Sequence, residues 1–301
     1  MEVVITDMDY EVDYFEGKTR KILVLGSGGQ VGAYLTEYLR CADVEVMEFD
    51  ITNGPDQDMT VIPNGELEAK IYMADFVYFL AFDVGGSHYL KKYQHTFNFI
   101  DNNTRLMANA FGLIEKYKKP FVFASSQMSN MSYSPYGVLK RVGELYTKSL
   151  GGLIVKFWNV YGIEKDMDKA HVITDFIRKG FETGVIDMRT DGTEQREFLY
   201  AEDCCEALEQ LMLEYDQFTS DSELHITSFH STTILEIAKI IQGIFKANGK
   251  AVAIEKAHTK DEVQKDARNV PDPFIKKFWQ PRTSVEEGLK KVFEEMRKDY
   301  E

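Results

Sequence analysis

The sequence predicts an α/β protein built on a doubly wound parallel (Rossmann) sheet with a smaller mixed α/β lobe. Two observations lead to this prediction. The sequence contains a series of short apolar runs, and most neighbouring runs are separated by an amphipathic stretch of helical length, such as residues 31–39 or 103–116. These runs lie at residues 22–25, 44–49, 76–81, 121–124, 153–158 and 224–226. Near-continuous apolar strands that alternate with helices are typical of a parallel sheet covered on both faces, which binds ligands at the carboxyl ends of its strands.

Three regions follow one another along the chain. Residues 1–20 form an acidic N-terminal extension, for which an edge strand and a solvated arm both stay open. Residues 21–165 are expected to form a dinucleotide-binding Rossmann domain. Residues 166–301 are expected to form mainly a substrate-binding lobe, with a strand near 223–227 that returns to the sheet. Its helices are expected at 172–182, 201–213, 233–247 and 284–298.

Composition argues against several classes of partner. The 301 residues carry a formal net charge of −14, whereas nucleic acids and membrane surfaces need a basic face, so we expect neither as a partner. No apolar run approaches the roughly 20 residues that span a bilayer, and the N-terminus lacks a leader pattern. Cys41, Cys204 and Cys205 have no spacing typical of disulfides or zinc. We therefore expect a cytoplasmic protein without a bound metal.

A glycine-rich turn follows the first predicted strand. The spacing of Gly26, Gly29 and Gly32 allows a tight turn, close approach to a pyrophosphate and close packing of helix on strand. Asp50 closes the second strand, where a carboxylate accepts hydrogen bonds from both ribose hydroxyls and repels a 2′-phosphate. A glycine turn alone could be only a tight connection, but its place between strand and helix favours dinucleotide binding. We therefore expect NAD rather than NADP as the cofactor.

A tyrosine and a lysine four residues apart lie on one helix face. The ammonium favours the tyrosinate and so lowers the tyrosine pKa, and the pair can then act as acid and base on a hydroxyl. Of the chain's three such pairs, only Tyr136 and Lys140 begin a predicted helix, 136–149, after a strand that ends in Ser125 and Ser126. We expect Ser126, Tyr136 and Lys140 to be catalytic, with a surface pair as the alternative. The other two pairs are Tyr14/Lys18 and Tyr161/Lys165.

Taken in order, the motifs resemble those of the extended short-chain dehydrogenase/reductases that modify nucleotide sugars. The resemblance covers roughly residues 21–300 and implies an NAD-dependent enzyme acting on a nucleotide sugar. Its motifs are Gly26-x-x-Gly29-x-x-Gly32, Ser125-Ser126, Tyr136-x-x-x-Lys140, Asn159-Val160-Tyr161-Gly162 and the segment 191–198.

The resemblance also implies a set of binding residues. Asn102 would be the active-site asparagine, Asp58 and Met59 would flank the adenine, and Asn159 and Arg196 would hold the substrate's diphosphate. Asn159 could instead be a turn residue, and Arg196 a surface ion-pair partner. The implied cofactor residues are Gly26, Gly29, Gln30, Val31, Gly32, Asp50, Ile51, Asp58, Met59, Leu80, Ala81, Asn102, Ser125, Tyr136, Lys140 and Phe157. The implied substrate residues are Gly85, Gly86, Ser87, Ser126, Asn159, His171, Val172 and Arg196.

The residues after Ser126 separate the activities of this family. The 4,6-dehydratases carry Thr-Asp-Glu at the serine, whereas this chain has Ser126-Gln127-Met128 and no acid there. The 3,5-epimerases of GDP-sugars carry a cysteine two residues past the serine. This chain has Met128 there, or Gln127 if Ser125 is the catalytic serine, and neither side chain can abstract a proton from carbon. Dehydration and 3,5-epimerisation are therefore not expected.

Two other segments do resemble the GDP-sugar epimerases. One is the loop 81–88 with Gly85 and Gly86, and the other is 169–173 with His171, which could equally be a packed side chain. Whether His171 and Lys169 take part in catalysis stays open. We expect oxidation of a sugar hydroxyl, with C4 favoured, by hydride transfer to NAD from a nucleotide sugar, with GDP favoured. A 4-epimerase that re-reduces the ketone is the alternative, and a non-catalytic NAD-sensing protein is a weaker one.

Two further expectations concern the pocket and the assembly. Only nine residues separate Ser126 from Tyr136, where the family usually has a longer loop, so we expect a more open sugar pocket. We also expect a homodimer through helices 103–116 and 136–149. Its apolar interface would include Leu106, Met107, Phe111, Leu139, Val142 and Leu145.

Overall fold

A six-stranded parallel sheet forms the centre of the larger part of the molecule, in the order β2-β1-β3-β4-β5-β9. The computed structural model describes residues 19–264 and 269–300, so the expected extension lies almost wholly outside the described residues. The chain runs from β1 to β2 on one side and then crosses to β3 on the other, which creates a topological switch point beside β1. The strands are β1 (Arg20–Leu25), β2 (Val44–Phe49), β3 (Phe76–Phe79), β4 (Phe121–Ser126), β5 (Leu153–Phe157) and β9 (Leu224–Ile226).

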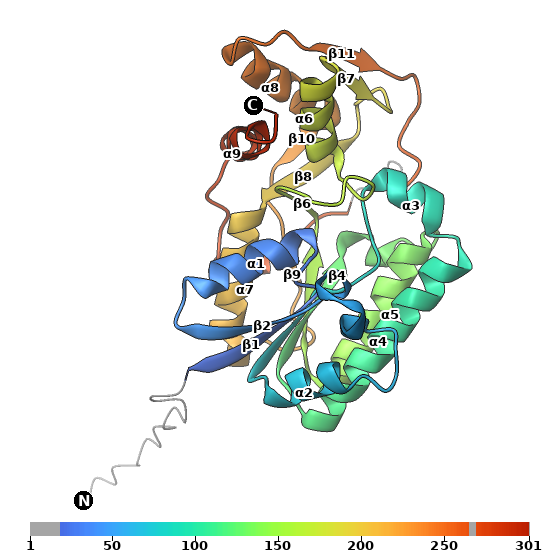
Figure 1. Ribbon diagram of the computed structural model, residues 1–301, viewed down its shortest axis with the longest axis vertical. Coiled ribbons are helices and arrows are strands. Elements are labelled where there is room, and N and C mark those ends of the chain that lie inside the picture. Colours follow the sequence, from blue (N-terminus) through green and yellow to red (C-terminus); the bar gives the residue numbers. More distant parts are fainter. Residues whose placement is uncertain (1–18, 265–268, 301) are drawn as a thin grey trace, which may run out of the picture.

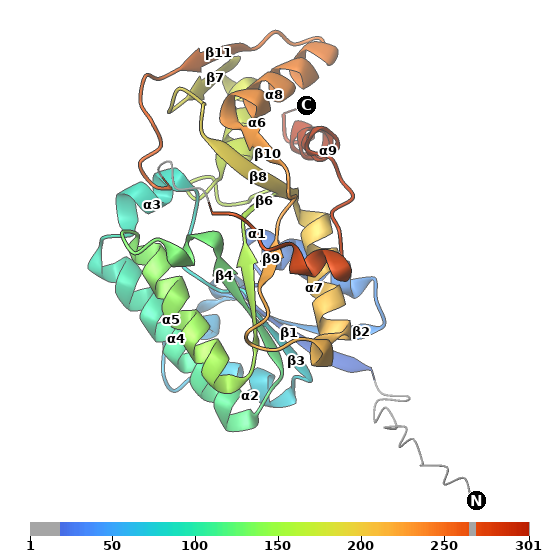
Figure 2. The same ribbon diagram turned by 180° about the vertical axis from the view of Figure 1, so that it is seen from behind.

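Helices cover both faces of this sheet (Figures 1 and 2). Side chains alternate along β1, so Ile22 packs with α1 (Gln30–Arg40) and α7 (Ala201–Leu213), while Leu23 packs toward the opposite face. That opposite face is covered by α2 (Gly65–Met73), α4 (Phe97–Tyr117) and α5 (Pro135–Leu150). Burial on both faces explains why the strands read as continuous apolar runs. The predicted doubly wound α/β fold is confirmed.

A smaller lobe lies at one end of the sheet, where Figure 1 shows it above the strands. It contains two small sheets, β10-β8-β6 and β11-β7. Three helices, α6 (Val172–Glu182), α8 (Ile234–Ala247) and α9 (Val285–Arg297), share an apolar core with them. The strands are β6 (Asn159–Tyr161), β7 (Val185–Met188), β8 (Gln195–Tyr200), β10 (Ser231–Thr233) and β11 (Ala253–Lys256). A short helix, α3 (Ser87–Tyr93), lies beneath this lobe in Figure 1. None of the helices in the described part of the chain is long and apolar enough to cross a membrane.

Helices α4 and α5 leave a row of apolar side chains exposed. Two of the residues expected at a dimer interface, Val142 and Leu145, belong to this row. The other four are wrong as interface residues, because they are buried within the protomer: Leu106, Met107, Phe111 and Leu139. The remaining exposed members of the row are Phe97, Ile100, Val138 and Tyr146. The homodimer stays a prediction, with this corrected surface.

Candidate active site

A cavity of about 550 Å³ lies at the carboxyl ends of the central strands. Its walls come from the turn after β1, the end of β2, the loop after β3, the end of β4, the start of α5 and the loop after β6. This is the switch point at which doubly wound sheets bind their ligands. Every residue expected to contact the cofactor lines it.

The glycine-rich turn brings bare backbone to the cavity wall. Gly26 has φ of +90°, and a Cβ there would collide with the backbone of Ala81. A Cβ on Gly32 would overlap the Gly26 carbonyl, so the start of α1 can approach β1 only without a side chain. Gly28, which sequence reasoning missed, also lines the cavity, and a Cβ there would collide with Thr52. The free N–H groups at the start of α1 suit a pyrophosphate.

Asp50 stands at the end of β2 with its carboxylate held in place. Its Oδ1 accepts hydrogen bonds from the Thr52 backbone N–H at 2.9 Å and from the Thr52 hydroxyl at 2.8 Å. The Gln57 side-chain oxygen accepts from the Asp50 N–H at 3.1 Å. These bonds fix a carboxylate on the cavity wall beside Gly28 of the glycine turn, as binding of an adenosine ribose requires.

Ser126, Tyr136 and Lys140 also meet at the cavity. Tyr136 occupies the first turn of α5, which Ser134 caps by accepting a hydrogen bond from Gly137. The buried Lys140 Nζ donates to the Ala124 carbonyl at 2.6 Å and lies 3.8 Å from the ring centre of Phe82. The end of β4 and one face of α5 therefore hold the three groups together.

Burial sets the protonation of this pair. It raises the pKa of Tyr136 to about 12, although a hydrogen bond with Ser126 acts in the opposite direction. Burial lowers the pKa of Lys140 to about 7. The net shift of the tyrosine pKa is therefore upward, not downward as expected, because desolvation outweighs the effect of the ammonium. The ammonium bonds a carbonyl and lies 5.9 Å from the Tyr136 ring centre, so desolvation dominates.

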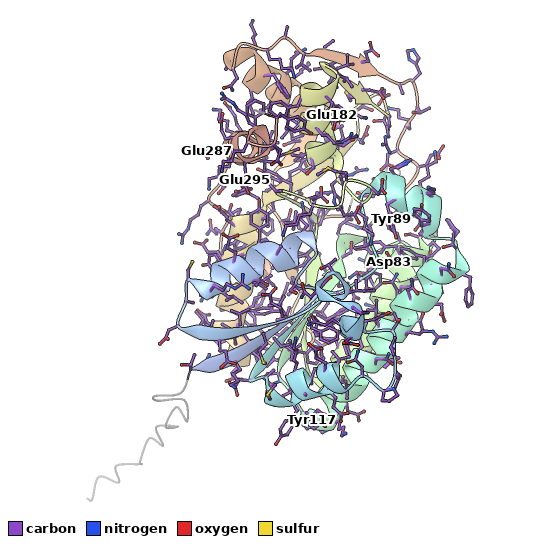
Figure 3. All side chains as sticks on the ribbon, in the orientation of Figure 1. Asp83, Tyr89, Tyr117, Glu182, Glu287 and Glu295 are labelled. Atoms are coloured by element: carbon purple, nitrogen blue, oxygen red, sulfur yellow. The ribbon has the colours of Figure 1, made fainter. Side chains whose placement is uncertain are left out.

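Two ion pairs line another part of the cavity. Lys169 Nζ lies 3.1 Å from Asp83 Oδ1, which also accepts a hydrogen bond from the Tyr89 hydroxyl at 2.6 Å; Figure 3 labels Asp83 and Tyr89. His171 Nδ1 lies 2.6 Å from Glu164 Oε1, and its backbone N–H donates to Glu164 Oε2 at 2.7 Å. We call these four charged side chains the paired-charge wall.

Glu164 controls the state of His171. Burial alone would lower the His171 pKa, but the charge of Glu164 and its hydrogen bond outweigh burial and raise that pKa. Sequence reasoning named His171 and missed Glu164, because a glutamate seven residues before a histidine matches no recognisable motif. The pair can hold or deliver a proton at this wall.

The expected substrate residues are only partly brought together. Gly85, Ser126 and His171 line the cavity. Arg196 on β8 lies outside the lining and forms an ion pair with Asp261, as the alternative expected, although the pair is largely buried and not at the surface. Four other expected substrate residues also lie outside the lining: Gly86, Ser87, Asn159 and Val172. Their roles in binding the substrate stay predictions.

The loop after β3 depends on a neighbour of the predicted asparagine. Asn102 lines the cavity, whereas Asn103 is fully buried. The Asn103 Oδ1 accepts from the Asp83 N–H at 2.8 Å, and its Nδ2 donates to the Asp83 carbonyl at 3.1 Å. Asn103 therefore fixes Asp83 in the paired-charge wall. Two adjacent asparagines in one helix could not be told apart by sequence spacing.

The short segment between Ser126 and Tyr136 is covered from elsewhere in the chain. The Tyr133 hydroxyl donates to the Gln264 carbonyl at 3.0 Å, and Gln127 Nε2 donates to the Gln264 side chain at 3.2 Å. Val263 beside it is buried. Residues 263 and 264 thus lie against the short segment that was expected to leave the sugar pocket more open. Among residues 19–264 and 269–300, no group of His, Cys, Asp or Glu side chains is placed to hold a metal ion.

The fold and the cavity define a protein of the Rossmann type, with a serine, a tyrosine and a lysine beside a glycine-rich turn in one cavity. The sequence matches the NAD dependent epimerase/dehydratase family over residues 22–226, and the chain belongs to this family. It is therefore an NAD-dependent enzyme of a family that includes nucleotide-sugar epimerases, dehydratases and decarboxylases. The alternative of a sensor without catalysis is set aside.

Curated relatives and solved structures give the same class. GDP-L-fucose synthase of Sinorhizobium fredii is 28% identical over 172 residues, 53% of this chain and 53% of that protein, so the match spans about half of the relative. UDP-glucuronic acid decarboxylase 1 of Danio rerio is 23% identical over 100% of this chain and 78% of its own length. The structure of UDP-glucuronic acid 4-epimerase from Bacillus cereus, with UDP-glucuronic acid and NAD, superposes with a TM-score of 0.77 at 20% identity, covering 93% of this chain and 100% of that chain.

Proposed function

We propose that this enzyme oxidises a sugar hydroxyl of a nucleotide sugar at C4 by hydride transfer to NAD, with a GDP-sugar as the favoured substrate. The observation that supports this most is one cavity lined by Ser126, Tyr136 and Lys140 together with the glycine turn and Asp50. Such a cavity can hold a dinucleotide and present an acid–base group to an alcohol.

Each proposed catalytic side chain has a separate task. When bound, NAD would supply the hydride acceptor. Tyr136 would give its own proton to water and take the hydroxyl proton as the tyrosinate, so a positive charge beside the phenol is needed to offset the effect of burial on its pKa. Ser126 bridges the substrate hydroxyl and the phenol, and Lys140 in its charged form stabilises the tyrosinate. Asp50 and the glycine turn hold the adenosine end.

Chemistry favours C4 as the oxidised carbon. A decarboxylase of a sugar acid and a 4-epimerase both need a ketone at C4. The ketone makes the carboxyl group that of a β-keto acid, which loses carbon dioxide readily, and it removes the stereocentre that an epimerase must invert. The absence of an acidic side chain at Gln127 and Met128 argues against dehydration.

The proposal that the substrate's nucleotide base is guanine rests on two segments. The loop with Gly85 and Gly86 and the segment with His171 resemble those of GDP-sugar epimerases, and a GDP-L-fucose synthase is among the relatives. Uracil is the competing base, because several relatives are named for UDP-glucuronic acid. Substrate tests must therefore include both.

The test is a panel of GDP-, UDP-, CDP- and dTDP-sugars incubated with the protein and NAD. We expect a rise in absorbance at 340 nm with a GDP-sugar and a 4-keto product by NMR. Conversion to the C4 epimer without net NADH would identify the 4-epimerase. Turnover of only UDP-sugars would overturn the choice of base, and a product altered at another carbon would overturn C4.

We also propose that the protein is a homodimer through the exposed faces of α4 and α5. The apolar row from Phe97 to Tyr146 would otherwise remain in contact with water. One protomer has a mass of 34.6 kDa. Light scattering should therefore give about twice that mass at micromolar concentration, and a mass near one protomer would contradict the proposal.

A further inference from the structure

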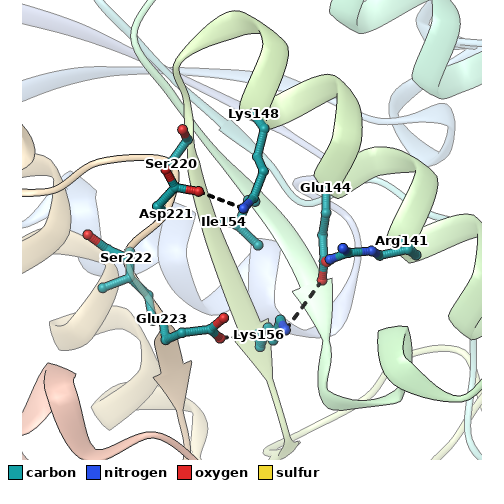
Figure 4. A pocket seen from close by; sticks show the side chains of 10 residues that line it. Arg141, Glu144, Lys148, Ile154, Lys156, Ser220, Asp221, Ser222 and Glu223 are labelled. Atoms are coloured by element: carbon teal, nitrogen blue, oxygen red, sulfur yellow. Dashed lines mark hydrogen bonds and ion pairs between the residues drawn. The ribbon is translucent and has the colours of Figure 1, made fainter.

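A cluster of charged side chains, two of them buried, lies behind the end of β4, outside the lining of the active-site cavity (Figure 4). Glu144 on α5 is at its centre and is 1% exposed. Lys156 on β5, which is 7% exposed, lies 4.0 Å from Glu144 and 3.6 Å from Glu223. Arg141 approaches from the solvent side and donates to Glu144 Oε2 at 2.6 Å. Sequence reasoning did not predict this cluster.

Glu144 connects this cluster to the proposed catalytic groups. Its Oε1 accepts a hydrogen bond from the Ser125 hydroxyl at 2.6 Å, directly beside Ser126. It also follows Lys140 by one helical turn and Tyr136 by two, so the three side chains lie on one face of α5. Lys140 and Glu144 thus bond consecutive residues at the end of β4, namely Ala124 and Ser125.

The surroundings of Lys140 make a nearby negative charge important. A buried ammonium is unfavourable unless it is paired. The groups that face it are the Ala124 carbonyl and the Phe123 ring from β4, the Phe82 ring from the loop after β3, and Tyr136 and Glu144 from α5. Lys156 and Arg141 reach Glu144 from its other sides. Burial lowers the pKa of Lys140, and the charge of Glu144 acts to raise it.

Glu144 itself is held ionised. Burial works against the carboxylate, but hydrogen bonds from Ser125 and Arg141 and the charge of Lys156 lower its pKa below the ordinary value. The charge is therefore present throughout the neutral range in which Lys140 titrates.

We propose that Glu144 is a positioning residue for the Tyr136–Lys140 pair: it fixes the end of β4 through Ser125 and supplies the negative charge that stabilises the Lys140 ammonium. Its importance for catalysis rests on the proposed function, in which the charged form of Lys140, and not the neutral form, stabilises the tyrosinate. Without Glu144 the lysine is mostly neutral at pH 7, and Tyr136 loses its cationic neighbour.

The test is a lysine titration by NMR on the full-length protein labelled with ¹³C at the lysine Cε. The Lys140 signal is identified by its absence in Lys140→Arg, and we expect a titration midpoint near pH 7. Glu144→Gln keeps an oxygen to accept from Ser125 but removes the charge. We expect it to lower the midpoint by about one pH unit, as the loss of one neighbouring opposite charge does.

Two further variants separate charge from structure. Arg141→Gln removes the half-exposed cation that is paired with Glu144 Oε2, so it should raise the midpoint of Lys140. Glu144→Asp keeps the charge and should stay closer to the parent than Glu144→Gln. A structural role alone predicts that water entering a loosened site raises the midpoint in every variant. An unchanged or raised midpoint in Glu144→Gln, or a lowered one in Arg141→Gln, would overturn the proposal.

This titration uses neither substrate nor turnover. A sugar panel without any reaction would overturn the proposed function and leave the titration result intact. A midpoint that fails to fall in Glu144→Gln would overturn the role of Glu144 even in an enzyme that oxidises a GDP-sugar as proposed.

Discussion

The two ends of the cavity are built in different ways. At the cofactor end, Gly26, Gly28 and Gly32 form the wall from bare backbone, and the geometry follows from the absence of side chains within one short turn. At the other end, the paired-charge wall consists of titratable side chains from segments up to 86 residues apart. Protonation does not change the backbone geometry, but it changes the charge of the side chains in the paired-charge wall. We therefore expect substitutions at the two ends to affect different quantities.

The largest effect is expected where the two ends meet, at Tyr136. Tyr136→Phe removes the phenol that we propose takes the substrate proton, and it should reduce the rate by about 10²- to 10⁴-fold. NAD affinity should change little, because we propose that the glycine turn and Asp50 hold the cofactor's adenosine end. Stopped-flow measurement of NADH formation and calorimetric titration of NAD separate the two effects.

Tyr161→Phe is the matched control, since Tyr161 and Lys165 also stand four residues apart. The Tyr161 side chain is buried in the smaller lobe, and its hydroxyl donates to the Val285 carbonyl at 3.3 Å. The rate of Tyr161→Phe should stay within a few-fold of the parent. If Tyr136→Phe kept most of its activity, or Tyr161→Phe lost as much, the assignment of the site would be wrong.

The contrast also explains how much of the site could be predicted from the sequence. The glycine turn, Asp50 and the Tyr136–Lys140 pair lie within short stretches whose spacing fixes their geometry, and the sheet follows from apolar runs. Glu164 could not be assigned to His171 in this way, nor Asp261 to Arg196, which lies 65 residues before it. Such partners depend on how separate segments fold together, and a single sequence does not show that.

The second prediction concerns the stability of the protein, because burial removes water from the Lys140 ammonium. Lys140 has its pKa lowered from 10.5 to about 7 by burial, so the unfolded chain holds a proton between these values that the folded protein does not. The cost to stability is fully present below pH 7 and disappears as the pH rises through 10.5. Lys140→Met should therefore stabilise the protein by about 2 kcal/mol at pH 7 while abolishing turnover.

Urea unfolding at pH 7 and pH 10 checks this, because the gain should shrink at the higher pH. Lys91→Met is the control, since the Lys91 side chain is 63% exposed in its pair with Glu262. Its stability should stay within about 0.5 kcal/mol of the parent. A Lys140→Met variant that is less stable than the parent at pH 7 would contradict the account of burial given above.

At the cofactor end, Asp50 should set the choice between NAD and NADP. Its carboxylate repels a 2′-phosphate, so we expect NAD to bind at least tenfold more tightly, a difference of about 1.4 kcal/mol. Asp50→Asn keeps an oxygen for the Thr52 bonds and should narrow this gap. Calorimetric titration measures both, and equal or tighter binding of NADP by the parent would contradict the prediction.

The smallest expected effect lies in the paired-charge wall, where Glu164 raises the pKa of His171 against the effect of burial. Glu164→Gln should lower that pKa, because it removes the negative charge that favours the protonated ring. Because the His171 pKa is raised in the folded protein, the His171–Glu164 pair stabilises the folded state fully below pH 6.5. This stabilisation is lost as the pH rises through the raised pKa of His171. The stability loss in Glu164→Gln should accordingly be largest in acid.

Histidine NMR, with the signal identified by its absence in His171→Gln, gives the change in the His171 pKa directly. Asp166→Asn, in the same loop but exposed, should leave it unchanged. NAD affinity should stay the same in both variants, and a change there would mean that the two ends of the cavity are coupled.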